Sequence, residues 1–100
     1  MFDGQKYVTC GVNSSVDPNI QLFIWNLIEN LKSKIQLDYL QVFELSKIIY
    51  LGKPAQKLTH SQEIPYHTQE YILSNDEPVD QKIYIIDDYT HSTMLLAEEY

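Results

Sequence analysis

The stretch of the chain that decides its fold is Asp17-Pro18-Asn19-Ile20-Gln21-Leu22-Phe23-Ile24-Trp25-Asn26-Leu27-Ile28-Glu29-Asn30-Leu31. Apolar residues recur at helical spacing through this stretch and just beyond it, at Ile20, Phe23, Ile24, Leu27, Ile28, Leu31 and Ile35. Asp17 is a favourable N-cap, and Pro18 suits the first helical turn, because its missing N–H would have no partner there. The pattern predicts one long amphipathic helix that ends near residues 34–36.

Two large apolar residues of this helix, Leu22 and Trp25, fall well off the apolar stripe at about 100° per residue. A helix that lies on one sheet has no use for apolar side chains there. We therefore interpret Leu22 and Trp25 as interaction residues that another chain or a partner covers. The alternative is that the first strand, or the tail that ends at Tyr100, folds over this side of the helix.

The other elements are predicted strands. Their β-branched and aromatic residues and their flanking turn residues indicate strands at Lys6–Val12, Tyr39–Tyr50, Lys57–Glu63, Tyr66–Ser74, Lys82–Asp87 and Thr93–Glu98, of which Lys57–Glu63 is expected to be exposed or at an edge. Short links favour antiparallel pairing. The chain is therefore predicted to be a single α+β domain over residues 1–100, with one long helix on a curled antiparallel sheet of roughly four to six strands. The element order is that of a cystatin-like roll, by analogy.

The strands carry more apolar side chains than one covered face requires. In the strand from Tyr39, Phe43 and Leu45 occupy one face, while Leu40 and Val42 occupy the other. An antiparallel sheet with one wet face alternates apolar with polar residues, and these strands do not. Because a single helix covers only one face, we expect a homodimer that buries roughly 1,200–2,000 Å² in total to absorb the surplus.

The charge balance restricts the partners. Fourteen acidic residues against seven lysines, with no arginine, give a net charge of −7. Such a surface repels nucleic acid and anionic membranes but permits a basic protein partner. Cys10 is alone, so it cannot form an internal disulfide. The first residues lack the basic and apolar regions of a signal peptide, and no stretch approaches the ~20 apolar residues of a membrane span. We expect a cytoplasmic protein.

A few polar residues are candidates for chemistry. Glu44 lies mid-strand beside Val42, where burial would suit a general acid or base, although a lysine partner or a wet edge is the commoner explanation. Asp87, Asp88 and His91 are close enough in sequence to bind a divalent metal, although Asp-rich loops usually bond their own backbone. These four residues are the candidate polar site. No phosphate loop, nucleophile elbow or zinc-ligand pair occurs, so the sequence predicts no cofactor or metal and favours a non-enzymatic protein.

Several blocks of the sequence carry a family resemblance: Tyr7-Val8-Thr9-Cys10-Gly11-Val12, Leu22-Phe23-Ile24-Trp25-Asn26-Leu27-Ile28, Leu37-Asp38-Tyr39-Leu40-Gln41-Val42-Phe43-Glu44-Leu45, His60-Ser61-Gln62-Glu63 and Ser92-Thr93-Met94-Leu95-Leu96-Ala97-Glu98-Glu99-Tyr100. Over nearly the whole chain they resemble the small proteins, mainly of Gram-positive bacteria, grouped as domain of unknown function 960. The resemblance implies a short, single-domain cytoplasmic protein. It implies no activity and no functional residues.

Three functional hypotheses follow from the sequence. The first is a non-enzymatic interaction protein that forms a homodimer. The second is a small-molecule-binding or enzymatic domain with a tyrosine-lined pocket, in which Glu44 or His91 supplies the polar group. The third is an acidic inhibitor that docks on a basic protein.

Overall fold

The predicted amphipathic helix is α2, Pro18–Leu31, in a computed structural model that describes residues 1–75 and 77–100. Asp17 caps the helix, because its carboxylate accepts the Asn19 N–H at 2.8 Å. The helix ends at Leu31, three residues before the predicted end. There the N–H groups of Lys34 and Ile35 both bond to the Leu31 carbonyl, which closes the last turn.

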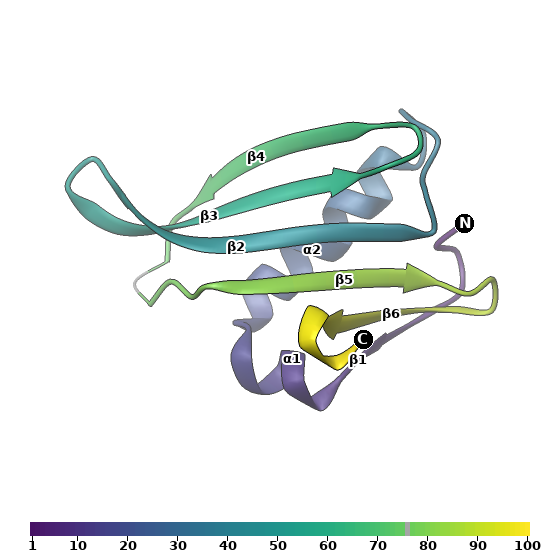
Figure 1. The fold of residues 1–100 in the computed structure, drawn as a ribbon, viewed down its shortest axis with the longest axis horizontal. Coiled ribbons are helices and arrows are strands. Elements are labelled where there is room, and N and C mark those ends of the chain that lie inside the picture. Colours follow the sequence, from purple (N-terminus) through teal and green to yellow (C-terminus); the bar gives the residue numbers. More distant parts are fainter. Residues whose placement is uncertain (76) are drawn as a thin grey trace.

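The sheet contains six strands in the order β1-β6-β5-β2-β3-β4 (Figure 1). Their bounds are β1 Gln5–Val8, β2 Leu40–Tyr50, β3 Lys53–Gln62, β4 His67–Leu73, β5 Gln81–Asp87 and β6 His91–Leu96. Helices and strands together confirm an α+β fold, whereas the likeness to a cystatin-like roll stays a prediction. The sheet is mixed, because β1 pairs parallel with β6 while the other neighbours are antiparallel.

One strand prediction was wrong. The segment predicted to be exposed or at an edge is β3, which lies between β2 and β4, so β4 forms this edge of the sheet. After β4 the chain crosses past β3, and β5 pairs with the other side of β2. Strand β2 therefore occupies the middle of the sheet, between β3, which follows it directly in the sequence, and β5, which begins only at Gln81, well after β2 ends at Tyr50.

The first predicted strand is too long. It ends at Val8, and a short helix, α1 (Cys10–Ser15), begins where the β-branched run continues. The Thr9 hydroxyl oxygen accepts the Val12 N–H at 3.3 Å and so caps this helix. The same hydroxyl donates to Glu99 at 2.7 Å, at the end of the 3-10 turn η1 (Ala97–Glu99). Capping at Thr9 thus overrides the β propensity of Cys10-Gly11-Val12.

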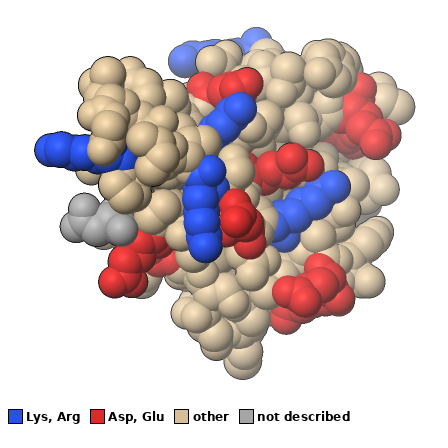
Figure 2. All heavy atoms as spheres, turned by 60° about the vertical axis from the view of Figure 1, so that its left-hand side comes forward, with Lys and Arg blue, Asp and Glu red and all other residues tan. Residues whose placement is uncertain are grey.

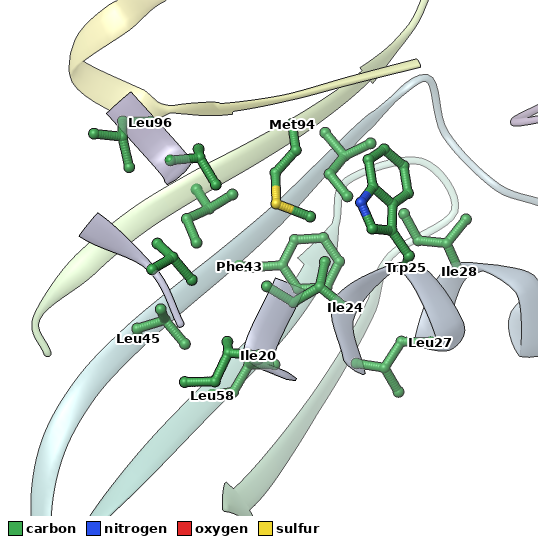
Figure 3. Packing of buried hydrophobic residues seen from close by; sticks show 14 of the residues in the cluster. Ile20, Ile24, Trp25, Leu27, Ile28, Phe43, Leu45, Leu58, Met94 and Leu96 are labelled. Atoms are coloured by element: carbon green, nitrogen blue, oxygen red, sulfur yellow. The ribbon is translucent and has the colours of Figure 1, made fainter. Parts of the chain in front are cut away.

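The long helix α2 lies on one side of the sheet, and the hydrophobic core fills the space between α2 and the inner face of the strands (Figure 1). The inner side chains of the central strands are buried, among them Phe43, Leu45, Leu58, Ile83, Ile85, Met94 and Leu96. In Figure 3 Phe43 and Leu58 lie next to Ile24 and Ile20 of α2. Burial alternates along β5 and β6, so the opposite side chains of these strands project away from the helix.

Gly4 is required where the chain enters β1. A Cβ at this position would lie 2.2 Å from the Thr90 carbonyl oxygen and 2.7 Å from its carbon, and both atoms belong to the backbone. We expect Gly4→Ala to lower the free energy of unfolding by about 1–3 kcal/mol, because the backbone must shift to accommodate the methyl group. Urea unfolding followed by circular dichroism measures the change.

Gly52 provides the matched comparison for this prediction. It has a φ of +80°, but a Cβ at this position would meet no atom within 4 Å, so Gly52→Ala introduces conformational strain without a steric clash. We expect Gly52→Ala to cost only about 1 kcal/mol. A Gly4→Ala protein as stable as the wild type would contradict the close approach to Thr90.

Candidate interaction face

The side chains that project away from α2 form an apolar patch in the middle of the sheet. The strand register brings these side chains together, because Val42 lies opposite Tyr84, and Tyr84 lies opposite Leu95. In the next row Leu40 lies opposite Ile86. We call these five residues, Leu40, Val42, Tyr84, Ile86 and Leu95, the outer patch. Cross-strand neighbours on one face are about 5 Å apart at Cβ, so the side chains are in mutual contact range.

The long helix α2 does not cover the outer patch, and the short helix η1 contacts β5 at its border. In Figure 1 the long helix α2 lies behind the sheet, and its front remains open across β2 and β5. Tyr100 approaches the patch, with its ring edge-on to Tyr84 at a centroid distance of 5.5 Å, but Tyr100 is itself 74% exposed. The outer patch is therefore a half-buried aliphatic and aromatic surface where an antiparallel sheet usually carries polar side chains.

Two ion pairs lie beside the outer patch. Glu44 lies 3.7 Å from Lys82, and Lys57 lies 3.1 Å from Glu70. Figure 2 shows acidic and basic side chains next to one another on the surface, and not a patch of one sign. Although the chain has a net charge of −7, these two pairs add no net charge to the border of the patch.

A shallow groove adjoins the outer patch at the start of β2. Its volume is about 270 Å³, and its walls include Tyr39, Leu40, Val42 and Tyr66. Tyr39 is 52% and Tyr66 is 77% exposed, so the groove presents aromatic rings beside the aliphatic patch. Tyrosine is enriched in protein interfaces because its ring is apolar and its hydroxyl stays hydrated.

Leu22 and Trp25, the two residues that fall off the apolar stripe of the helix, differ in their exposure. Trp25 is 9% exposed and belongs to the core, whereas Leu22 is 59% exposed. The Lys6 ammonium of β1 lies 5.8 Å from the centroid of the Trp25 ring, so the first strand passes over this side of the helix. The chain therefore covers Trp25 by itself, and Leu22 remains on the helix surface.

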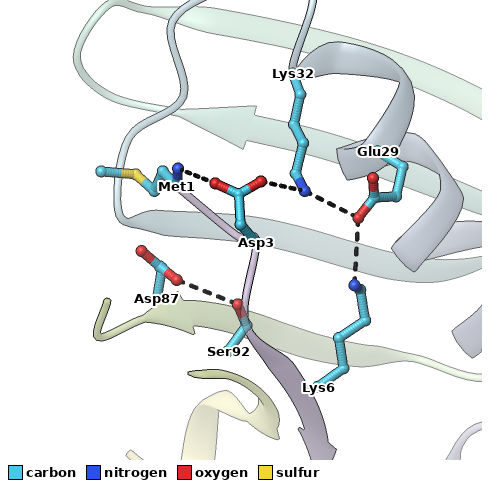
Figure 4. Close-up of polar contacts among 7 residues, drawn as sticks. All are labelled: Met1, Asp3, Lys6, Glu29, Lys32, Asp87 and Ser92. Atoms are coloured by element: carbon cyan, nitrogen blue, oxygen red, sulfur yellow. Dashed lines mark hydrogen bonds and ion pairs between the residues drawn. The ribbon is translucent and has the colours of Figure 1, made fainter. Parts of the chain in front are cut away.

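A chain of ion pairs holds the N-terminal segment against α2 (Figure 4). The Lys32 ammonium lies 3.0 Å from both Asp3 and Glu29, and Lys6 lies 3.2 Å from Glu29. The hydrogen bond from Lys32 lowers the pKa of Glu29. Exposed ion pairs of this kind contribute little to stability individually, but together these pairs join β1 and the N-terminal segment to α2 beside Trp25.

The predicted polar-site residues do not form one site. Glu44 is exposed and faces Lys82, which places it on the outward face in an ion pair. Asp87 is 6% exposed and accepts a hydrogen bond from the Ser92 hydroxyl at 3.3 Å. Asp88 and His91 pair with each other instead, at 3.0 Å. Asp87 continues β5 on its inner side, and the alternation of the strand turns Asp88 away from it.

Two further properties concern metals and membranes. The described residues contain no group of three or more histidine, cysteine or acidic side chains that could hold a metal ion. Within the same residues, no helix is long and apolar enough to cross a membrane.

The candidate surface that sequence reasoning missed is the outer patch as a unit. Its signal was present in the sequence, because Val42, Tyr84 and Leu95 break the expected alternation. Their grouping depends on the pairing of β5 with β2, which local sequence does not specify.

Comparison with known proteins places the chain in a family. A crystal structure described as a protein of unknown function from Enterococcus faecalis has a TM-score of 0.76 and 31% sequence identity, and the match covers 98% of this chain and 92% of that one. No curated protein matches. The family model described as "Staphylococcal protein of unknown function (DUF960)" matches residues 5–99, which confirms the resemblance seen in the sequence: the chain belongs to this family.

Proposed function

We propose that this protein is a non-enzymatic interaction module that forms a homodimer through the outer patch. The observation that carries the proposal is the apolar outer patch of the sheet, which the long helix α2 leaves uncovered. The accessible surface of the single chain is 6141 Å², close to the roughly 5,900 Å² expected for a folded monomer of this mass. A chain with the surface area of a folded monomer is consistent with docking between two folded chains.

The size of the open face suits a stable dimer. Six strands about 4.8 Å apart span about 24 Å, and the seven residues of β5 at about 3.3 Å each span about 23 Å. The flat area of the whole sheet, of which the outer patch occupies only parts of β2, β5 and β6, is thus roughly 550 Å² per copy. A standard interface buries about 800 Å² per partner, so the face approaches what a specific dimer needs.

The charge pattern favours a second copy as the occupant. A two-fold axis brings the same surface of both chains together, so each charged group meets the same set of groups on its partner. The pairs Glu44–Lys82 and Lys57–Glu70 bring equal numbers of positive and negative charges to each copy. Two acidic chains can therefore meet at this face without like-charge repulsion from these groups.

The test replaces an apolar residue of the outer patch by a charge. We expect Ile86→Lys to raise the dimer dissociation constant about 30-fold or more, the effect of losing one interface hot spot. Sedimentation velocity at several micromolar concentrations measures the association, and circular dichroism verifies that the variant is folded.

Leu22→Lys is the control, because Leu22 is exposed on α2, on the opposite side of the sheet. This variant should dimerise like the wild type. A wild-type chain that remains monomeric at 100 µM (a concentration about a hundredfold above a typical micromolar Kd) would refute the proposal. So would a dimer that Leu22→Lys disrupts and Ile86→Lys does not.

A further inference from the structure

The hairpin formed by β2 and β3 ends in three consecutive exposed apolar residues, Ile49, Tyr50 and Leu51, which we call the hairpin tip. They are 71%, 47% and 87% exposed, and Figure 1 shows the hairpin projecting beyond the other elements at the left. Because side chains alternate along a strand, Ile49 lies on the inner face of β2 and Tyr50 on the outer face. The hairpin tip is therefore apolar on both faces and at its end, which is unusual for a surface that meets only water.

The turn at the hairpin tip holds Leu51 in a backbone conformation that does not suit leucine. Tyr50 lies opposite Lys53, so Leu51 and Gly52 form a two-residue turn, and their φ angles of +52° and +80° make it type I′. Such turns favour Asn-Gly or Asp-Gly, because a bulky side chain is strained at positive φ. Leu51 is almost fully exposed, so burial within the chain does not offset this strain. An apolar residue kept in a strained, exposed position points to a role in binding.

The hairpin is basic, although the whole chain is acidic. Residues 45–62 contain three lysines and no acidic residue, whereas the net charge of the chain is −7. One of these lysines, Lys57, pairs with Glu70 at 3.1 Å. The other two, Lys47 and Lys53, form no ion pair with a carboxylate of the described residues. Two ammonium groups thus accompany the hairpin tip and favour an anionic partner.

The shape of the hairpin tip favours a lipid bilayer over a peptide as this partner. A groove of about 800 Å³ beside the tip is lined by residues that include Tyr50, Ala55 and Ile72 of the outer face. A peptide in that groove would leave Ile49, on the inner face, and Leu51, at the end, in water. A bilayer instead surrounds a projecting tip on all sides, and anionic lipids attract the adjacent lysines.

We propose that the hairpin tip inserts into the surface of an anionic phospholipid bilayer, with its three apolar side chains toward the acyl chains and with Lys47 and Lys53 at the lipid phosphates. The flexible lysine stems allow the ammonium groups to reach the phosphates while the methylene groups stay beside apolar surface. The net charge predicts repulsion from such a membrane, so only a tip-first approach keeps the acidic body away. That body begins at Asp80, which accepts the Lys47 N–H at 2.9 Å. The inference is independent of the outer patch, which lies near the start of β2.

The test measures co-sedimentation of the full chain with vesicles of equimolar phosphatidylcholine and phosphatidylglycerol at low ionic strength. We expect binding to these vesicles, and binding that is roughly tenfold weaker to pure phosphatidylcholine, because the attraction of the two lysines is lost. Lys53→Gln should weaken binding to the anionic vesicles about fivefold, the usual contribution of one lysine near such a surface.

Leu51→Asn removes the end of the hairpin tip and supplies the Asn-Gly pair that a type I′ turn favours, so the variant should fold at least as well as the wild type. We expect it to lose vesicle binding roughly tenfold or more, the effect of no longer burying one leucine. Tyr89→Asn is the matched control. Tyr89 is 91% exposed, has a φ of +78° and follows β5 at the opposite end of the sheet, so its variant should bind like the wild type.

A wild-type chain that does not bind the anionic vesicles overturns the proposal. The proposal also fails if Leu51→Asn binds like the wild type, or if Tyr89→Asn loses as much binding as Leu51→Asn does. If the vesicles do not bind and Leu51→Asn instead lowers self-association in sedimentation velocity, the hairpin tip is a contact between copies of the chain. None of these vesicle results bears on dimerisation through the outer patch, which Ile86→Lys tests separately.

Discussion

Trp25→Ala is expected to lower the free energy of unfolding by about 3–5 kcal/mol, the usual cost of truncating a buried tryptophan. The side chain is 9% exposed, and in Figure 3 its indole lies beside Met94 and Ile28, beneath the sheet. A domain of this size has a total stability of only about 5–15 kcal/mol, so the variant loses a large share of it. Urea unfolding monitored by far-ultraviolet circular dichroism measures the loss.

Leu22→Ala is the comparison for this prediction, because Leu22 lies one turn earlier on the same helix and is 59% exposed. Its truncation should change the stability by no more than about 0.5 kcal/mol. If Trp25→Ala instead retains wild-type stability and loses only self-association, then a partner chain and not the core covers the indole. The pair of variants thus distinguishes the two interpretations of the helix pattern.

Local sequence predicts the helix and its cap but cannot decide what covers Trp25. Asp17 and Pro18 act within a few residues, so the start of α2 follows from the sequence alone. The cover over Trp25 comes from β1, which reaches that position by pairing parallel with β6 at the other end of the chain. A pairing between residues about ninety positions apart leaves no periodic signal in either segment.

The same reasoning explains the candidate sites. The strands β2 and β5 are predictable almost to the residue, because each is a run of β formers. Val42 lies opposite Tyr84 only because the chain crosses past β3 and β4 before it forms β5. No local sequence pattern requires this crossing. The separation of Asp87 from Asp88 was within reach of the sequence, since alternation along β5 puts neighbours on opposite faces. Because both residues were assigned to one acidic loop, this difference between Asp87 and Asp88 was not predicted.

The stability of the protein is expected to fall by about 3 kcal/mol between pH 6.5 and pH 4 because of one buried histidine, His60. Its surroundings fix which ring nitrogen carries the proton. Gln62 Nε2 donates to the carbonyls of Gln36 and Pro65, at 2.9 and 2.8 Å, so Gln62 Oε1 accepts from Gln41 Nε2 at 2.8 Å. Gln41 Oε1 must then accept from His60 Nε2, at 2.6 Å. The neutral ring therefore has its proton on Nε2 and a bare lone pair on Nδ1.

Protonation of that lone pair is unfavourable in the folded chain. His60 is fully buried and stacks on Phe43 at a centroid distance of 4.5 Å, and its Nδ1 has no hydrogen-bond partner among the described residues. Burial, with a smaller contribution from the charge of His67, lowers the pKa of His60 from 6.5 to about 4. The unfolded chain takes up this proton below pH 6.5, whereas the folded chain does so only near pH 4.

Stability is therefore constant above pH 6.5 and declines as the pH falls toward 4, by about 1.4 kcal/mol for each unit of the pKa difference. Carboxylates with lowered pKa values, such as Asp3 and Glu29, begin to destabilise the fold only below their ordinary values of 3.8 and 4.5, so they leave most of this window untouched. Urea midpoints measured between pH 4.5 and 8 at one protein concentration follow the decline.

His60→Gln removes the titrating group and should remove the slope between pH 4.5 and 6.5, even if the variant is less stable at every pH. His91→Gln is the matched control, because His91 lies at the surface beside Asp88 and its loss should leave the slope unchanged. A slope that survives in His60→Gln would show that another group takes up the proton on unfolding. The hydrogen bonds from Gln62 through Gln41 would then fix the orientation of His60 without making it the source of acid sensitivity.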